Sequence, residues 1–151
     1  MSFAQVSLST QGIEEAARKL GQLATFDQED MINAIGQLLW SSTRQRIATE
    51  KQGPQGEVWN PWSEDYAATR HGGHSLLQGR SDLHDSLMNI SQGLVASVGV
   101  HVAYGAIHQE GGQAGRNKSV TIPARPYLGI SDEDRNAITK LVIERVEAAL
   151  S

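Results

Sequence analysis

Several stretches of the chain place apolar residues at the spacing of an amphipathic helix. The clearest covers about residues 28–50, where Asp27 can cap the first turn and the charge of Asp30 favours the positive helix end. A shorter helix is predicted over residues 11–24, with Thr10 as its cap. Ser63 predicts a brief helix over residues 63–70, and Ser81 can cap another short segment. Most of the first seventy residues are therefore predicted to be helical.

A long helix is also predicted at the other end of the sequence, over residues 131–150. Ser131 stands at its cap and Asp134 at the capping-box position three residues later. The apolar arc of this helix, from Ile138 to Leu150, is wider than a simple surface helix needs. Either the arc lies deep in the protein's own core, or part of it meets another subunit, and the first explanation is preferred.

Between these helices the apolar pattern changes to an alternation of period two. Leu94, Ala96, Val98 and Val100 alternate with Val95, Ser97, Gly99 and His101, after a turn at Gln92-Gly93. This pattern predicts a β-hairpin over residues 87–101, and a further strand is expected over residues 119–122. The predicted fold class is α+β, with N-terminal helices and a long C-terminal helix packed on a small antiparallel sheet.

Composition narrows the class of protein. A chain of 151 residues, 39% hydrophobic and 20% charged, fits a single globular domain over residues 1–151. The net charge of −4 argues against a dedicated nucleic-acid binder, so DNA contact is expected to be incidental at most. Cysteine is absent, which excludes disulfides and thiolate metal sites. With no secretory signal and no apolar run of about 20 residues, the protein is expected to act in a cytoplasm, without membrane contact.

The five histidines invite a test for metal chemistry. A zinc site needs three or four converging ligands, and neither an H-E-x-x-H helix nor a compact histidine–carboxylate set is present. Nor is there a G-x-S-x-G motif for a nucleophilic serine. The sequence therefore predicts no catalytic, cofactor or metal site and no enzyme. The alternative that stays open is a small metal-dependent hydrolase built on the histidine set: His71, His74, His84, His101 and His108.

A glycine-rich basic segment at about residues 111–119 is predicted to be a mobile loop. Its sequence GQAGRNKS nearly matches a phosphate-binding loop, but a helical turn is expected before it and a strand after it, which is the reverse of that motif's context. Arg116, Lys118 and Arg125 follow Gly111 without an intervening acid. The segment is either a solvated connection or a loop that orders against an acidic partner or near DNA.

Two proline-containing segments are predicted to be rigid. In the run from Ile122 to Leu128, two prolines fix their own φ angles and extend the residues before them, so the run must leave the sheet edge as a stiff strap. Arg125, held between these prolines, should point in a defined direction. In the loop over residues 51–62, Trp59 and Trp62 are expected to pin the loop to the body.

These residues in order resemble the phage virion morphogenesis family. The resemblance covers about residues 30–150 and rests on Y-G-A-I-H-Q at 104–109, Gly111-Gly112, and I-P-A-R-P-Y-L-G at 122–129. Trp59-Asn60-Pro61 is similar to an earlier landmark of that family. The resemblance implies a structural protein that completes the phage tail and helps to join it to the head.

The resemblance also implies partners and places. The expected partners are further copies of the chain, forming a homo-oligomer and possible ring, together with phage tail and head–tail connector proteins. The expected location is the host bacterial cytoplasm during assembly and then the tail end or neck of the virion. The residues expected to form the assembly interface are Tyr104, His108, Gln109, Arg116, Lys118, Arg125 and Tyr127.

Overall fold

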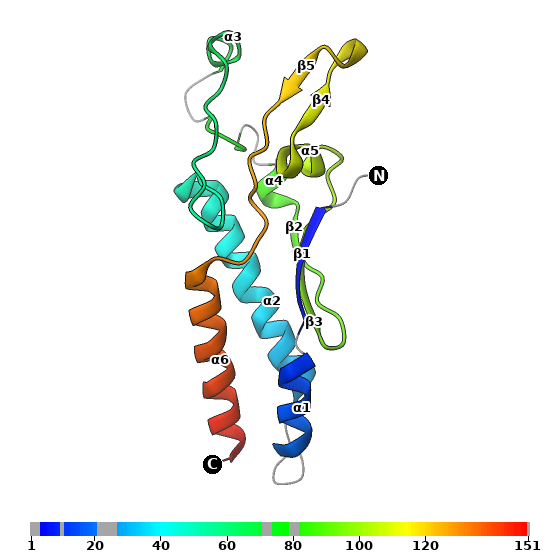
Figure 1. Ribbon diagram of the computed structural model, residues 1–151, viewed down its shortest axis with the longest axis vertical. Helices are drawn as coiled ribbons and strands as arrows, with labels where there is room; N and C mark the ends of the chain where they lie inside the picture. The colour runs from blue at the N-terminus through cyan, green and yellow to red at the C-terminus, as the bar shows by residue number, and fades with distance from the viewer. Residues whose placement is uncertain (1–3, 10, 21–26, 71–73, 79–81, 151) are drawn as a thin grey trace.

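A long helix, α2 (Gln28–Gln45), lies at the centre of the protein and runs diagonally along its length (Figure 1). The backbone N–H of Asp30 donates to Oδ1 of Asp27 at 2.9 Å, so the cap predicted from the sequence is confirmed. The helix continues into a π-helical turn, Arg46–Glu50, and the predicted extent to residue 50 is therefore confirmed. The computed structural model describes residues 4–9, 11–20, 27–70, 74–78 and 82–150.

The remaining elements follow the predicted order closely. The brief helix after Ser63 is confirmed, and its cap accepts a hydrogen bond from the N–H of Tyr66. Thr10, residues 21–24 of the first predicted helix and Ser81 lie outside the described residues. The other helices are α1 (Gln11–Leu20), α3 (Glu64–Ala67), α4 (Asp82–Asp85), α5 (Gly105–Glu110) and α6 (Asp132–Leu150). In the described part of the chain, no helix combines the length and apolar character needed to cross a membrane.

A three-stranded antiparallel sheet covers one side of α2. Its order is β1–β3–β2, with β1 (Ala4–Ser9), β2 (Leu87–Asn89) and β3 (Val95–Val100). The pairing of β2 with β3 confirms the hairpin predicted from the alternating pattern. The first strand was not predicted. The core lies between this sheet and α2, where Ala96, Val98 and Val100 belong to the same buried cluster as Ile32 and Ile35.

The sheet and α2 approach each other closely at Gly36. A Cβ atom added there would lie 2.2 Å from Oδ1 of Asn89 and 2.2 Å from Oγ of Ser91, which is well inside van der Waals contact. The absence of a side chain therefore lets the end of β2 rest against the helix. Asn89 then donates from its side-chain amide to the carbonyl oxygen and Oδ1 of Asn33. These bonds fix where the strand crosses α2.

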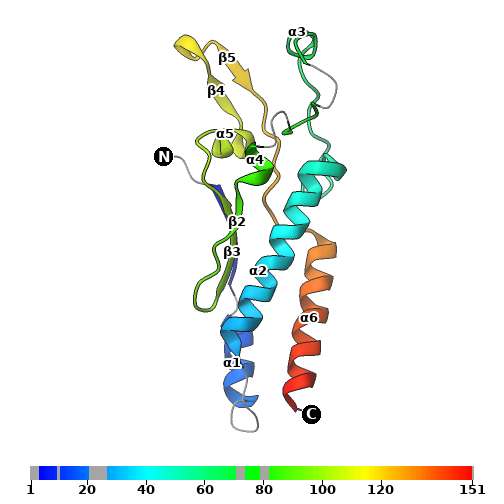
Figure 2. The same cartoon turned by 180° about the vertical axis from the view of Figure 1, so that it is seen from behind.

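Helix α6 packs along the opposite side of α2 from the sheet (Figures 1 and 2). Its predicted capping box is confirmed, because Ser131 N–H donates to Asp134 Oδ2 and Asp134 N–H donates to Ser131 Oγ, both at 3.0 Å. The preference for deep burial of its apolar arc is wrong. Ile138 is buried, but Ile143 is 51% exposed, because α6 has α2 on one side and solvent on the other.

A second, two-stranded sheet projects from one end of the body. Strands β4 (Gly112–Ala114) and β5 (Val120–Ile122) pair antiparallel, joined through a 3-10 turn at Arg116–Lys118. Strand β5 confirms the strand expected near residues 119–122, whereas β4 lies within the segment of about residues 111–119 that was expected to be a mobile loop. The hairpin and the loop that carries α3 project side by side at this end (Figures 1 and 2).

Candidate assembly site

The proline-clamped strap, residues 123–130, crosses the protein from β5 to α6. Tyr127 is fully buried on it, and its hydroxyl donates to the carbonyl oxygen of Gly105 at 2.8 Å. Burial raises the pKa of this phenol, so it remains a protonated donor. Tyr127 therefore ties the strap to the first turn of α5.

Arg125 ties the same strap to the loop over residues 51–62, called here the tryptophan loop because it carries Trp59 and Trp62. Its Nε donates to the carbonyl oxygen of Asn60 at 2.8 Å and its Nη2 to that of Pro61 at 3.1 Å. Trp59 donates from Nε1 to the carbonyl oxygen of Pro126 at 2.9 Å. The predicted pinning of the loop is thus confirmed for Trp59, which is buried. Trp62 is half-buried, and its ring meets that of Tyr66 edge to face.

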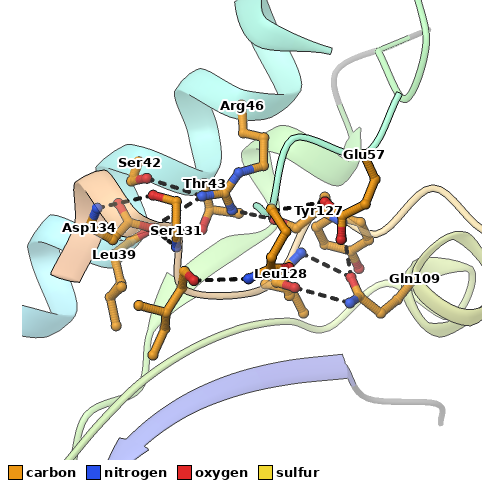
Figure 3. Close-up of polar contacts among 12 residues, drawn as sticks. Leu39, Ser42, Thr43, Arg46, Glu57, Gln109, Tyr127, Leu128, Ser131 and Asp134 are labelled. Atoms are coloured by element: carbon orange, nitrogen blue, oxygen red, sulfur yellow. Dashed lines mark hydrogen bonds and ion pairs between the residues drawn. The ribbon is translucent and has the colours of Figure 1, made fainter. Parts of the chain in front are cut away.

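Gln109 holds the strap by hydrogen bonds that a neighbouring strand would otherwise supply. Its side-chain Oε1 accepts from the backbone N–H groups of Tyr127 at 3.1 Å and Leu128 at 2.9 Å (Figure 3). Its Nε2 donates to the carbonyl oxygen of Leu128 at 3.1 Å. One amide therefore satisfies three backbone groups of an extended segment that pairs with no strand among the described residues.

A buried ion pair anchors the far end of the strap. Arg46 reaches from the end of α2, and its Nη1 donates to the carbonyl oxygen of Tyr127 at 2.6 Å (Figure 3). Its Nη2 lies 3.2 Å from Oδ2 of Asp134, the carboxylate that also closes the capping box of α6. This pair joins α2, the strap and α6 at one point. It was not predicted, because residues 46 and 134 lie 88 positions apart and neither carries a local motif that relates it to the other.

Two predicted interface residues lie at the tip of the β4–β5 hairpin. Arg116 and Lys118 are both exposed, and neither has a carboxylate within 4.0 Å among the residues that the structure describes. Asn117 and Lys118 both take left-handed backbone angles, with φ of 57° and 53°. Such angles are uncommon outside glycine and turn the chain sharply at the tip. The two cations are therefore displayed at the end of the projection.

The last two predicted interface residues, Tyr104 and His108, flank the same turn of α5. Their rings meet edge to face at a centroid distance of 5.7 Å, and Tyr104 is 39% exposed. Burial, and secondarily the charge of Arg125, lowers the pKa of His108, so the imidazole is neutral near pH 7. Both side chains line a cleft of about 660 Å³ between the hairpin and the α3 loop.

The histidines do not assemble into a metal site in the part of the chain that the structure describes. No group of three or more histidine, aspartate or glutamate side chains is placed there to hold an ion. His84 makes a local contact with Asp85 at 2.9 Å, His101 is exposed, and His108 belongs to the cleft. His71 lies outside the described residues. The hydrolase alternative therefore has no ligand set among the residues whose positions are known.

The seven predicted residues fall into three groups. Gln109, Arg125 and Tyr127 are brought together around the strap and point into the protein, so they organise the site from inside. Tyr104 and His108 line the cleft, which Arg125 also borders, and Arg116 and Lys118 stand apart at the hairpin tip. An assembly role for any of them remains a prediction. For Tyr127, which is fully buried, it would have to be indirect, through the position of the strap.

The sequence that folds in this way matches the model of a known protein family. The chain matches the phage virion morphogenesis family over residues 8–147, and it therefore belongs to that family. The resemblance inferred from the sequence motifs is confirmed, and the protein is a phage structural and assembly protein that works with other phage assembly components.

Two relatives come from Mu-like phages. The capsid assembly protein G of Escherichia phage Mu is 31% identical over 137 residues, which cover 87% of this chain and 88% of that protein. The Mu-like prophage FluMu G protein 2 of Haemophilus influenzae is 54% identical over 39 residues, 26% of this chain and 28% of that protein. No solved structure is significantly similar to this chain.

Proposed function

We propose that this protein completes the phage tail and joins it to the head, acting as a homo-oligomer that forms a ring. It would do so in the host cytoplasm and stay at the tail end or neck of the virion. The observation that carries the proposal is the projecting β4–β5 hairpin, held on a rigid strap and bearing two exposed cations without acidic partners among the described residues. Membership of the morphogenesis family supports the same reading.

A structural joint needs a fixed base and a displayed contact surface. The base is supplied by the strap, whose backbone groups and side chains bond to α2, α5 and the tryptophan loop. The display is supplied by Arg116 and Lys118, whose charges are free to meet an acidic surface. Ile143, on the outer side of α6, is 51% exposed and would lie at a separate contact between copies.

The test is a charge reversal at the hairpin tip in a phage that carries this gene. In Arg116→Glu/Lys118→Glu, full heads and complete tails should accumulate unjoined in lysates viewed by negative-stain electron microscopy. The matched control is Arg18→Glu/Arg135→Glu, which makes the same change of charge at exposed positions outside the hairpin and away from Ile143. Normal infectious particles from the tip variant would contradict the proposal.

Oligomer formation is tested on the purified protein. Sedimentation velocity should detect a species larger than the 16.4 kDa monomer, either alone or after addition of purified tails. If the protein stays monomeric in both conditions, the proposed ring of several copies is contradicted.

A further inference from the structure

One wall of the cleft between the hairpin and the loop that carries α3 is formed by strand β5. Three consecutive residues of β5, Val120, Thr121 and Ile122, all line it. Successive side chains of a strand point to opposite faces of a sheet, so a cleft that meets three in a row must run along the edge of the strand. The cleft therefore faces the backbone of β5 and not one face of the hairpin.

That edge of β5 is open. Within the described residues, β5 pairs with β4 on one side, and the two-stranded sheet contains no third strand. An unpaired strand edge presents backbone N–H and C=O groups that a further strand can bond. The edge is only three residues long, so most of the affinity of an added strand would have to come from side chains that it places in the cleft.

The cleft gathers apolar side chains that the fold leaves uncovered. Tyr66 is 48% exposed and Val120 is 49% exposed, and both line it together with Tyr104. Trp62 and Leu77 line it as well. Exposed aromatic residues that converge on one concave surface are typical of binding sites, whereas isolated ones are not.

The charges of the cleft favour an acidic occupant. Arg70 lies over the ring of Tyr66 at 4.3 Å and has no carboxylate within 4.0 Å in the described part of the chain. Arg125 adds a second guanidinium, which is already bonded to two carbonyl oxygens. Among the described residues of the lining, Asp82 is the single acidic one, against these two arginines. An incoming carboxylate would meet Arg70 without displacing an existing ion pair.

We propose that this cleft binds an extended, acidic segment of another virion protein, which adds a strand to the free edge of β5. Alternate apolar side chains of the segment would pack on Tyr66 and Tyr104, and an acidic side chain would pair with Arg70. The inference rests on the assembly role proposed above and names the kind of partner surface that the role requires.

Two other occupants fit less well. A second copy of this chain would have to offer an extended acidic segment, and its strands β1 to β5 contain no aspartate or glutamate. Nucleic acid would meet Asp82 and a largely apolar wall, in a protein of net charge −4. Both occupants are outcomes that the experiment distinguishes.

The experiment selects a yeast-displayed library of random heptapeptides on the full-length protein. Recovered peptides should carry aspartate or glutamate between apolar residues and should shift the backbone amide resonances of Val120, Thr121 and Ile122. Arg70→Glu should weaken their binding by about tenfold, whereas Lys140→Glu should not, since Lys140 is an exposed cation outside the cleft. A peptide N-methylated at the pairing positions keeps its side chains but loses its backbone donors, and should bind about tenfold more weakly.

Several results would overturn the inference. These are a failure to enrich any cleft-dependent peptide, enrichment of basic peptides, or equal binding by the N-methylated peptide. Binding of a ten-residue oligothymidine that Arg70→Glu abolishes would assign the cleft to nucleic acid. Self-association that Arg70→Glu and Tyr66→Ala abolish would assign it to a second copy. Because Tyr66 and Arg70 lie on the surface loop, thermal unfolding should confirm that both variants fold.

Failure of the inference and failure of the proposed function give different results. If unjoined heads and tails accumulate in the hairpin-tip variant but no acidic peptide binds, only the proposal that the cleft binds an acidic segment is contradicted. If acidic peptides bind the cleft but the hairpin-tip variant joins heads to tails normally, only the tail-completion role falls.

Discussion

Replacing Arg46 by methionine should strongly destabilise the protein, because the Arg46 side chain joins the end of α2 to the strap and to α6. Its side chain is 2% exposed and that of its partner Asp134 is 5% exposed. Methionine has a similar length and fills the space of the aliphatic part, but it leaves a carboxylate and the carbonyl oxygen of Tyr127 buried without their donor. The perturbation is therefore mainly electrostatic.

The expected size follows from the burial of both partners. Removing one partner of a buried ion pair typically costs about 3–5 kcal/mol, since the remaining charge is left uncompensated. For a chain of 151 residues, each kcal/mol lowers the melting temperature by about 2–4 °C, so a fall of at least about 6 °C is expected. The remaining hydrogen bond from Ser131 N–H to Asp134 Oδ2 keeps the loss from being larger.

Urea unfolding followed by circular dichroism measures this loss, with the m value checked for constancy. Lys140→Met is the matched control, because it removes an exposed cation and should change stability by no more than about 0.5 kcal/mol. In Arg46→Met/Asp134→Asn the unpaired charge is gone, so the double variant should be more stable than the sum of the single losses by about 1–3 kcal/mol.

The reasoning is refuted if Arg46→Met lowers the free energy of unfolding by less than about 1 kcal/mol at an unchanged m value. A buried carboxylate without its partner should destabilise the fold by more than that. It is also refuted if the losses of the single variants add without coupling. In that case the pair would not be the joint between the helices and the strap.

Three further predictions follow from close contacts elsewhere. Gly36→Ala should destabilise the protein by about 1–3 kcal/mol in urea, since the clash with Asn89 outweighs the higher helix propensity of alanine; a stabilised variant would show that β2 does not rest on α2 as described. Tyr127→Phe should cost about 0.5–1.5 kcal/mol by removing the buried hydrogen bond to the carbonyl oxygen of Gly105, and a neutral effect would contradict a role for that bond. The lowered pKa of His108 means that its neutral form stabilises the fold above its ordinary pKa of 6.5, and that this contribution is lost as pH falls through the folded-state value. The stability difference between the native protein and His108→Gln should therefore be constant above about pH 7 and fall in the acid range, whereas parallel pH profiles would exclude the effect.

Local signals in the sequence predicted local structure well. Asp27 and Ser131 each mark a helix start because a cap needs only residues within the next turn. The turn at Gln92-Gly93 predicted the β2–β3 hairpin for the same reason. Strand β1 was missed because its sequence, AQVSLS, is short and half polar, and its pairing with β3 depends on residues about ninety positions away.

The candidate site was predicted as a segment but not as an arrangement. Two prolines fix the backbone of the strap, yet they do not say where the side chains of Arg125 and Tyr127 end. Both turn inward, to carbonyl groups that lie 22 to 65 positions away. The arc of α6 raises the same difficulty, since an apolar face looks alike whether its own core or another subunit covers it. The cleft has no local signal, because its two walls come from separate parts of the chain.

The most direct test of the central claim is the particle made without this protein. Lysates of a phage deleted for the gene, with and without complementation by the native chain, would be counted by negative-stain electron microscopy. The account predicts normal heads and normal tails that remain separate, and joined particles when the native chain is supplied. Aberrant or missing heads would contradict it, placing the protein in capsid assembly instead, the role that the name of the phage Mu relative describes.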